Sequence, residues 1–334
     1  MVHRTPLGLA LLSCPSLVWT LALMGDDAGK KLRLEPGLEL VYKGKLALDT
    51  QADGGSIRCE SPWTLRGIVT ARHADGTAEW CLLPSIPPVD ATRGSETVGQ
   101  RAIDAIVTAR YDPSPDEARH AIEKPFLSLG NVLEETALGI LPLPFGGAPT
   151  SATGTSESPS LTLPGGLRFK TPVRWTARAV QDGIEIAART QHAGAQGELP
   201  IPVQLDHYSA DYLLDSQAEM VRSLRMAWTR STDLGGSKNV QKESAELTLE
   251  SARVLDAAAL KQAGEHHARA KALQKSLRAP GADLALAEQS GQAALEKAKG
   301  TPWEAPLRGL LALIAERRAS ALASGAPDAA TEEK

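Results

Sequence analysis

The chain has 334 residues, of which 42% are hydrophobic and 23% charged, and its formal net charge is −4. This is the ordinary balance of a soluble globular protein, long enough for two domains or for one large domain with an appendage. A slightly acidic chain argues against a dedicated nucleic-acid-binding protein, which usually carries a basic domain, so no nucleic-acid partner is predicted.

The N-terminus has the pattern of a secretory signal peptide. His3-Arg4 is a short polar start, residues 7–24 are apolar or small throughout, and residues 25–27 end the run. This order is typical of export signals. We therefore predict a signal peptide over residues 1–25 and a periplasmic or extracellular location. An uncleaved anchor is the alternative, because a spanning helix needs about 17–25 apolar residues.

Export changes how the cysteines are interpreted. Leu11-Leu12-Ser13-Cys14 looks like a lipobox, so a lipid on Cys14 would be another way to reach the membrane. Cys59 and Cys81 remain after processing, and the chain contains no C-x-x-C pair. Two cysteines in an oxidising compartment most simply form a structural disulfide, which we predict between Cys59 and Cys81. A redox-active pair would need closer spacing.

The first half of the mature chain has strand patterns. Period-two alternation predicts a half-buried strand over residues 38–48, with the apolar face formed by Leu38, Leu40, Tyr42, Leu46 and Leu48. Gly44 interrupts that face, where we expect a bulge or a close backbone approach. Residues 64–73 and 78–83 flank Asp75-Gly76, a strong hairpin signal. A two-residue turn there would place Cys81 opposite Thr70.

Similar hairpins recur in the second half. Alternating residues 173–179 and 184–188 flank Asp182-Gly183, and residues 208–214 and 224–228 flank a turn near 216–219. Such consecutive hairpins build an antiparallel sheet with one covered face. A further strand is expected over residues 245–249.

The stretch between these halves is harder to interpret. Residues 103–111 fit a strand slightly better than a helix. Residues 146–166 are rich in Ser, Thr, Gly and Pro, and we predict a flexible loop there.

Beyond Leu255 the pattern becomes helical. Residues 257–277 are rich in Ala, Lys, Leu and Gln, and Pro280-Gly281 ends the run. Asp283 is positioned to cap a second helix that Gly300 stops, and Pro302 opens a third. The apolar stripe of the third helix is formed by Leu307, Leu310, Leu311 and Ile314.

These elements predict a mainly β protein with a C-terminal α segment, an α+β fold. A large, curved antiparallel sheet of hairpins would occupy residues 30–256, about three helices residues 257–322, and a disordered tail residues 323–334. A curved sheet with a helix across its concave face can enclose an apolar pocket, as lipoprotein carriers do.

Few residues suggest chemistry. His207, Ser209 and Asp211 would share one strand face, but successive residues on one face lie about 7 Å apart, which makes neither a triad nor a metal site. A polar outer face, with Tyr208 and Tyr212 pointing inward, is the preferred interpretation. His266 and His267 are adjacent on a helix and cannot converge on a metal, so a solvated helix face is expected. No metal or cofactor motif is found.

Two segments carry a resemblance to a known group of proteins. Residues 35–44, EPGLELVYKG, resemble the opening of certain secreted planctomycete-type proteins, and residues 211–232 are similar to a later part of the same β-rich region. Some of those proteins continue into a thioredoxin-like domain. This chain has no C-x-x-C, so the resemblance implies compartment and fold without redox activity.

The leading functional hypothesis is an exported, non-enzymatic protein that binds a protein partner or an apolar ligand. One alternative is an exported hydrolase that uses His207 with Asp206 or Asp211. Another is an accessory domain of a thioredoxin-like redox system.

Overall fold

The structure is a computed structural model, and its described residues are 32, 34–112, 119–123, 131–144, 152–155, 161–164, 167–190, 193–195, 202–217 and 220–323. The predicted signal peptide, Cys14 and nearly all of the predicted C-terminal tail lie outside them. Most of the predicted loop 146–166 does too, although its described residues include two short strands.

The described residues form seventeen strands. The first eight are β1 (Leu38–Ala52), β2 (Gly55–Arg72), β3 (Ala78–Ile86), β4 (Val89–Arg93), β5 (Glu96–Gln100), β6 (Ile103–Asp104), β7 (Val107–Asp112) and β8 (Arg119–Ile122). The others are β9 (Thr153–Thr155), β10 (Leu161–Thr162), β11 (Arg168–Phe169), β12 (Arg174–Val180), β13 (Gly183–Thr190), β14 (Ala193–Gly194), β15 (Val203–Leu214), β16 (Val221–Leu234) and β17 (Ser237–Val254).

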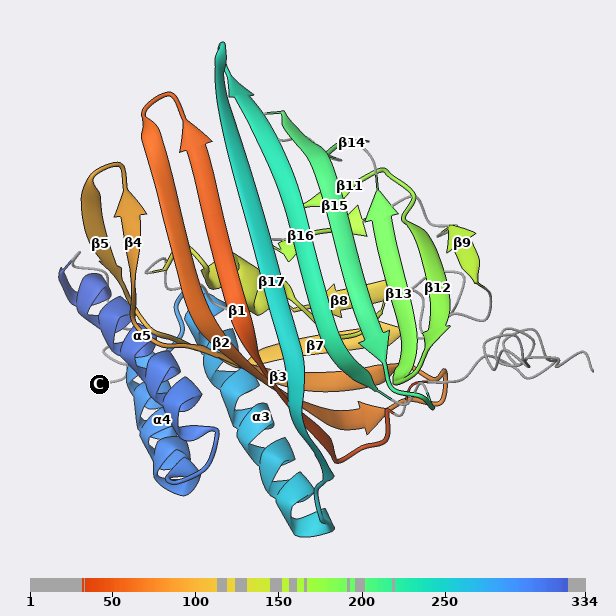
Figure 1. The fold of residues 1–334 in the computed structure, drawn as a ribbon. Coiled ribbons are helices and arrows are strands. Elements are labelled where there is room, and N and C mark those ends of the chain that lie inside the picture. The colour runs from red at the N-terminus through yellow and green to blue at the C-terminus, as the bar shows by residue number, and fades with distance from the viewer. Residues whose placement is uncertain are drawn as a thin grey trace, which may run out of the picture.

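Fifteen of these described strands form one antiparallel sheet, which confirms the predicted fold class. Its main order is β8-β7-β3-β2-β1-β17-β16-β15-β13-β12-β9, while β10 and β11 pair separately. β17 therefore lies between β1 and β16. Figure 1 shows β3, β7 and β8 crossing behind the lower part of the long strands, because the sheet curls over at β2 and β3. The sheet is thus strongly curved and has a concave inner face.

The predicted hairpins are confirmed, but two turns differ from the prediction. Between β2 and β3, the Asp75 carboxylate accepts hydrogen bonds from the backbone N–H and the hydroxyl of Thr77. This forms a longer loop, and with a bulge after Val69 it places Cys81 opposite Ile68, not Thr70. Between β12 and β13, Val180 pairs with Gly183, so the turn lies one residue earlier than Asp182-Gly183 suggests.

Two glycines are required by close backbone contacts. A Cβ at Gly44 would lie 1.7 Å from the carbonyl oxygen of Glu246, which confirms the predicted close approach. A Cβ at Gly183 would lie 1.8 Å from the carbonyl oxygen of Leu214. Neither position can hold a larger residue without moving a neighbouring strand.

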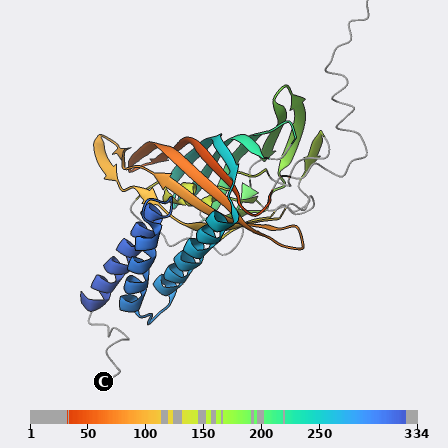
Figure 2. The ribbon, with the colours of Figure 1, turned by 90° about the horizontal axis from the view of Figure 1, so that it is seen from below.

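The helices are α2 (Glu134–Gly139), α3 (Ala257–Arg278), α4 (Leu284–Ala298) and α5 (Glu304–Ala323). Asp256 and Asp283 cap α3 and α4, and each carboxylate accepts a backbone N–H at 2.8 Å. The predicted cap at Asp283 is thereby confirmed. Figure 2 shows α3–α5 together at one end of the sheet. No described helix combines the length and the apolar character needed to cross a membrane.

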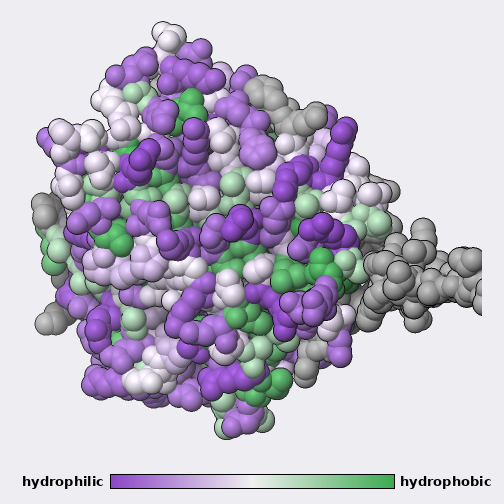
Figure 3. Space-filling model, viewed as in Figure 1, coloured by the Kyte–Doolittle hydropathy of each residue, from purple (hydrophilic) through white to green (hydrophobic). Residues whose placement is uncertain are grey.

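The buried side chains form two clusters on opposite faces of the sheet. The inner core lies on the concave face, and its largest members are Tyr42, Trp63, Leu65, Trp80, Tyr111, Phe169, Tyr208 and Trp228. The outer core lies between the sheet and α3–α5, and its members include Ile68, Cys81, Leu83, Ile106, Leu273, Leu277, Trp303, Leu307 and Ile314. The face seen in Figure 3 is mostly hydrophilic, with small hydrophobic groups between the polar residues.

Candidate functional site

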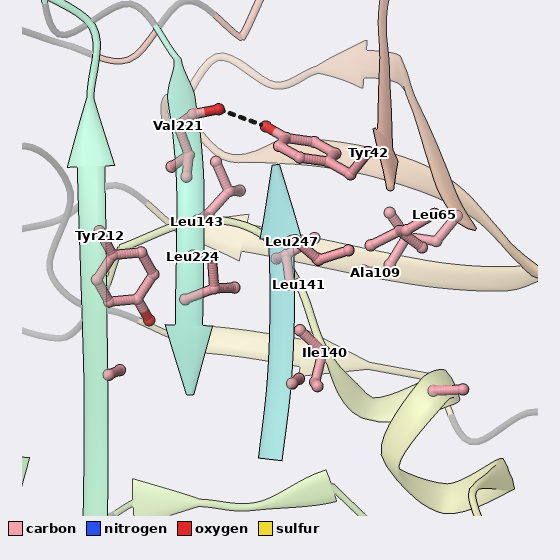
Figure 4. Close-up of a cluster of buried hydrophobic side chains, with 14 of the residues drawn as sticks. Tyr42, Leu65, Ala109, Ile140, Leu141, Leu143, Tyr212, Val221, Leu224 and Leu247 are labelled. Carbon is pink, nitrogen blue, oxygen red and sulfur yellow. Dashed lines mark hydrogen bonds between the residues drawn. The ribbon is translucent and has the colours of Figure 1, made fainter. Parts of the chain in front are cut away.

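The concave face is covered by residues 131–144, which we call the cover segment. Its apolar side chains belong to the inner core, and each is at most 6% exposed: Leu133, Leu138, Ile140, Leu141 and Leu143. Figure 4 shows Ile140, Leu141 and Leu143 among Tyr42, Leu65, Tyr212, Leu224 and Leu247, which come from strands far apart in the sequence. The cover segment therefore occupies the hollow of the curved sheet.

The cover segment has little local structure of its own. Its helix α2 spans six residues, and the residue before it, Leu133, provides no side-chain cap. Helices shorter than about 12–15 residues are marginal in water. The segment also joins neither sheet as a strand. Its conformation is therefore maintained by burial against the sheet.

A buried ion pair fixes the middle of the cover segment. Glu243 on β17 is 5% exposed, and its carboxylate lies 3.1 Å from a guanidinium nitrogen of Arg230 on β16. The Thr136 hydroxyl of α2 donates a hydrogen bond to the same carboxylate. The Arg230 Nε donates a hydrogen bond to the side-chain oxygen of Gln241 at 3.1 Å. The carboxylate of Glu135 on α2 lies 3.8 Å from a guanidinium nitrogen of Arg230. We call this group the latch, because it joins α2 to β16 and β17.

Side chains also hold the start of the cover segment. The Asn131 amide donates to the carbonyl oxygen of Arg101 at 2.6 Å, and the backbone N–H of Val132 donates to the Gln100 side chain at 2.9 Å. These contacts, like the latch, involve side chains and leave the hydrogen bonds between strands untouched. The cover segment can therefore be separated from the sheet without breaking the strand ladder.

The tyrosines of the concave face stay neutral. Burial raises the pKa of Tyr42 and of Tyr212 above the usual range. The Tyr42 hydroxyl donates a hydrogen bond to the carbonyl oxygen of Val221 at 2.9 Å (Figure 4). The hydroxyls add polarity to the concave face without adding charge.

The predicted outward positions on β15 are confirmed. His207 is exposed, Tyr208 and Tyr212 are buried, and a bulge separates Leu205 from His207. Asp211 forms an ion pair with Arg189 at 2.6 Å. Asp206, at that bulge, is half-buried. The described residues therefore show a polar strand face at the position where the hydrolase alternative would need a catalytic group.

The cysteines correct the predicted disulfide. Cys59 and Cys81 are both free and buried, Cys59 in the inner core and Cys81 in the outer core. Cys81 pairs with Ile68 of β2, and Cys59 precedes Ile68 by nine residues on the same strand. Nine residues of extended strand span roughly 30 Å. A disulfide needs Cα atoms within about 7 Å. Burial raises the pKa of both thiols, which favours the unreactive protonated form.

The histidines of α3 correct a second prediction. His266 and His267 are 2% and 4% exposed, so they do not lie on a solvated helix face. His266 stacks on Trp303 with ring centroids 5.7 Å apart, and the Thr108 hydroxyl lies 2.7 Å from His267 Nε2. Burial lowers the pKa of both imidazoles. Within the described part of the chain, no three His, Cys, Asp or Glu side chains are grouped to hold a metal ion.

No pattern in the sequence indicates the cover segment, whereas one pattern does indicate the latch. Arg230 continues the inward series Leu224, Met226 and Trp228, and Glu243 precedes Ala245 and Leu247 on the neighbouring strand. Opposite charges at inward positions of two adjacent strands indicate a buried ion pair.

Comparisons with known proteins give little more. No family model matches the chain, and no curated protein matches it. One similar solved structure is described as lipid–protein interactions in lipovitellin, with a TM-score of 0.43 and 10% identity. The match covers 67% of this chain and 26% of the lipovitellin chain, so about two thirds of this chain corresponds to about a quarter of that one. A likeness of this size is too small to carry a functional argument.

Proposed function

We propose that the protein is an exported, non-enzymatic binding protein of the cell envelope, and that its concave face receives an apolar ligand. One observation carries the proposal: an apolar concave face is covered by a segment that is not a strand of the sheet. The pattern of the first 25 residues supports export.

The cover segment and an apolar ligand would bury the same surface. Apolar contact is non-directional, so a flexible hydrocarbon chain can replace the side chains of Leu141 and Leu143 against the sheet. Displacing the cover segment also breaks the contacts of Thr136 and Glu135 with the latch. The closed form is then the resting state, and only a ligand of sufficient apolar area opens it.

The other hypotheses gain less support. The hydrolase alternative requires a nucleophile or a metal beside His207. His207 is exposed, and Asp211, on the same strand, already pairs with Arg189. The redox-accessory alternative gains nothing from two buried thiols with raised pKa values. Kinship with secreted planctomycete-type proteins remains part of the proposal and rests on the two resembling segments alone.

The test is uptake of a fluorescent fatty acid, cis-parinaric acid, by the full chain, with palmitic acid as competitor. We expect saturable binding that palmitic acid reverses, and native mass spectrometry should show the bound palmitate. Leu141→Ala should increase uptake, because it weakens the packing of the cover segment. Leu286→Ala is the matched control, since Leu286 is 58% exposed on α4. The proposal fails if neither the wild type nor a folded Leu141→Ala protein binds the probe competitively.

A further inference from the structure

Two adjoining grooves lie on the outer face, where the sheet meets the start of α5. Their volumes are about 530 and 350 Å³, and Thr64, Ser85 and Asp104 line both. The first groove extends along β1 and β2, and the second reaches the segment that leads into α5. They lie on the opposite face of the sheet from the cover segment, and the proposed apolar site does not involve them.

The groove walls are rich in proline, which fixes the backbone and offers no N–H group. Six prolines line the two grooves: Pro62, Pro84, Pro87, Pro88, Pro302 and Pro306. Such walls are rigid and largely apolar. They suit the aliphatic part of a long side chain better than a dense set of hydrogen bonds.

Asp104 provides the charge at the shared part of the grooves. It belongs to the short strand β6, where it pairs with Ser85, and the Ser85 hydroxyl donates to its carboxylate at 2.7 Å. α5 approaches closely at this point, since a Cβ at Gly309 would lie 3.1 Å from the Asp104 carbonyl oxygen. Burial raises the pKa of Asp104, against the effect of the Ser85 hydrogen bond. The carboxylate is therefore held in place but poorly compensated.

The basic side chains of the grooves already have partners. Lys43 pairs with Glu250 at 2.5 Å, Arg66 with Glu39 at 2.7 Å, and Arg308 with Glu304 at 2.5 Å. Within the described residues, no ion pair includes Asp104. A carboxylate can accept about four hydrogen bonds, and Ser85 supplies one. Asp104 thus has capacity for a cation from outside the chain.

We propose that these grooves bind a basic side chain, lysine or arginine, of a partner protein. The ammonium or guanidinium group would pair with Asp104, and the aliphatic stem would lie along the proline walls. An ion pair in a partly buried groove with preformed walls avoids much of the ordering cost of an exposed pair. This contact recognises a polypeptide, whereas the concave face recognises an apolar ligand.

The test uses a blocked alanine pentapeptide with arginine, lysine or citrulline at its centre. Each peptide is titrated into the full isotope-labelled chain, and the amide shifts of Ser85 and Asp104 are followed by NMR. We expect saturable shifts with the arginine or the lysine peptide. Citrulline keeps the shape of arginine without its charge, and should bind at least about tenfold more weakly.

Asp104→Asn should weaken binding of the basic peptides by a similar factor, while retaining the Ser85 hydrogen bond. Asp182→Asn is the matched control, because Asp182 is an exposed turn residue outside both grooves. Equal binding of arginine and citrulline peptides, or no saturable shift with either basic peptide, would overturn the proposal. The citrulline comparison uses the wild-type chain and does not depend on a variant folding. Spermidine that binds as tightly as the peptides would overturn the assignment to a protein partner.

Discussion

The two faces of the same sheet are covered in different ways. On the outer face, α3, α4 and α5 each span 15 residues or more, and Asp256 and Asp283 cap two of them. On the inner face, the cover segment has one six-residue helix without a side-chain cap. We call α3–α5 together the helical cover. Both the helical cover and the cover segment bury apolar side chains on the sheet, but the helical cover also buries them between its own helices.

This difference shows that a segment can be fully buried on the sheet without having a stable local structure of its own. The helical cover satisfies its backbone hydrogen bonds internally and has its own packing, so it adds stability to one end of the sheet. The cover segment is equally buried but depends on the sheet for its conformation. A region of low local stability over an apolar surface is where ligand-dependent opening is expected.

The largest expected effect comes from the latch. Arg230→Ala leaves Glu243 buried without its main counter-charge, and should reduce the free energy of unfolding by about 3–5 kcal/mol in urea titrations. Arg225→Ala is the matched control on the same strand, since Arg225 and Glu246 pair on the exposed face. Its effect should be within about 1 kcal/mol. Similar losses of unfolding free energy for both variants would show that the buried latch stabilises the fold no more than an exposed ion pair does.

Truncation in the helical cover should have the next largest effect. Leu307 is fully buried in the outer core, and Leu307→Ala should cost about 2–5 kcal/mol. Because this loss concerns the outer face, hydrogen exchange should accelerate in α3–α5 and leave α2 unchanged. Leu141→Ala should produce the reverse pattern. Exchange that accelerates equally in both covers would show that the two faces are not independent.

The helix caps should have smaller effects. Asp256→Ala and Asp283→Ala each remove one hydrogen bond to a backbone N–H at a helix start. Thermal unfolding should show a loss of about 1 kcal/mol for each variant. Asp256→Asn should lose less, because asparagine is also a good cap. An unchanged midpoint for both alanine variants would contradict the role given to these caps.

The smallest expected effect concerns the two buried histidines of α3, and it lowers stability only at acidic pH. Burial, then Arg269, lowers the pKa of His266, while Glu265 opposes the shift. Burial also lowers the pKa of His267, with Lys271 acting in the same direction and Glu79 and Glu123 against it.

Below about pH 6.5 the unfolded chain binds protons that the folded chain does not, so the free energy of unfolding should fall from there toward the lowered pKa values. His266→Phe keeps a ring against Trp303 and should reduce this fall. His207→Phe, at an exposed position, should not. Urea titrations between pH 5 and 7 would separate these outcomes.

Local signals in the sequence predict the sheet well. Alternation identifies the inward residues of β1, all of which are buried, and the Asp-Gly pairs locate two hairpins. The exact turns are less predictable, because the loop after His73 depends on the contacts of Asp75 with Thr77. The extra residues of that loop and the bulge alter the register along β3.

The buried polar groups depend on distant partners and are harder to foresee. Burial opposes ionisation of Glu39, but hydrogen bonds from Arg253 and Arg66 lower its pKa. These arginines lie on two different neighbouring strands, which alternation within β1 cannot reveal. The burial of His266 and His267 is hard to predict because α3 is rich in alanine, and its buried face therefore carries a weak hydrophobic pattern. The latch at the proposed apolar site likewise joins residues of different strands, so it can be recognised only once the strand pairing is known.

The place of β17 has a consequence for how the chain matures. The last of the described strands, β17, lies between β1 and β16, so it joins the early strands to the late ones. Until residues 237–254 are available, the nascent chain holds two partial sheets with unpaired edges at β1 and β16. Such edges favour intermolecular pairing, and closing a contact over about two hundred residues is slow. A chain with this topology would need protection from aggregation until residues 237–254 have emerged.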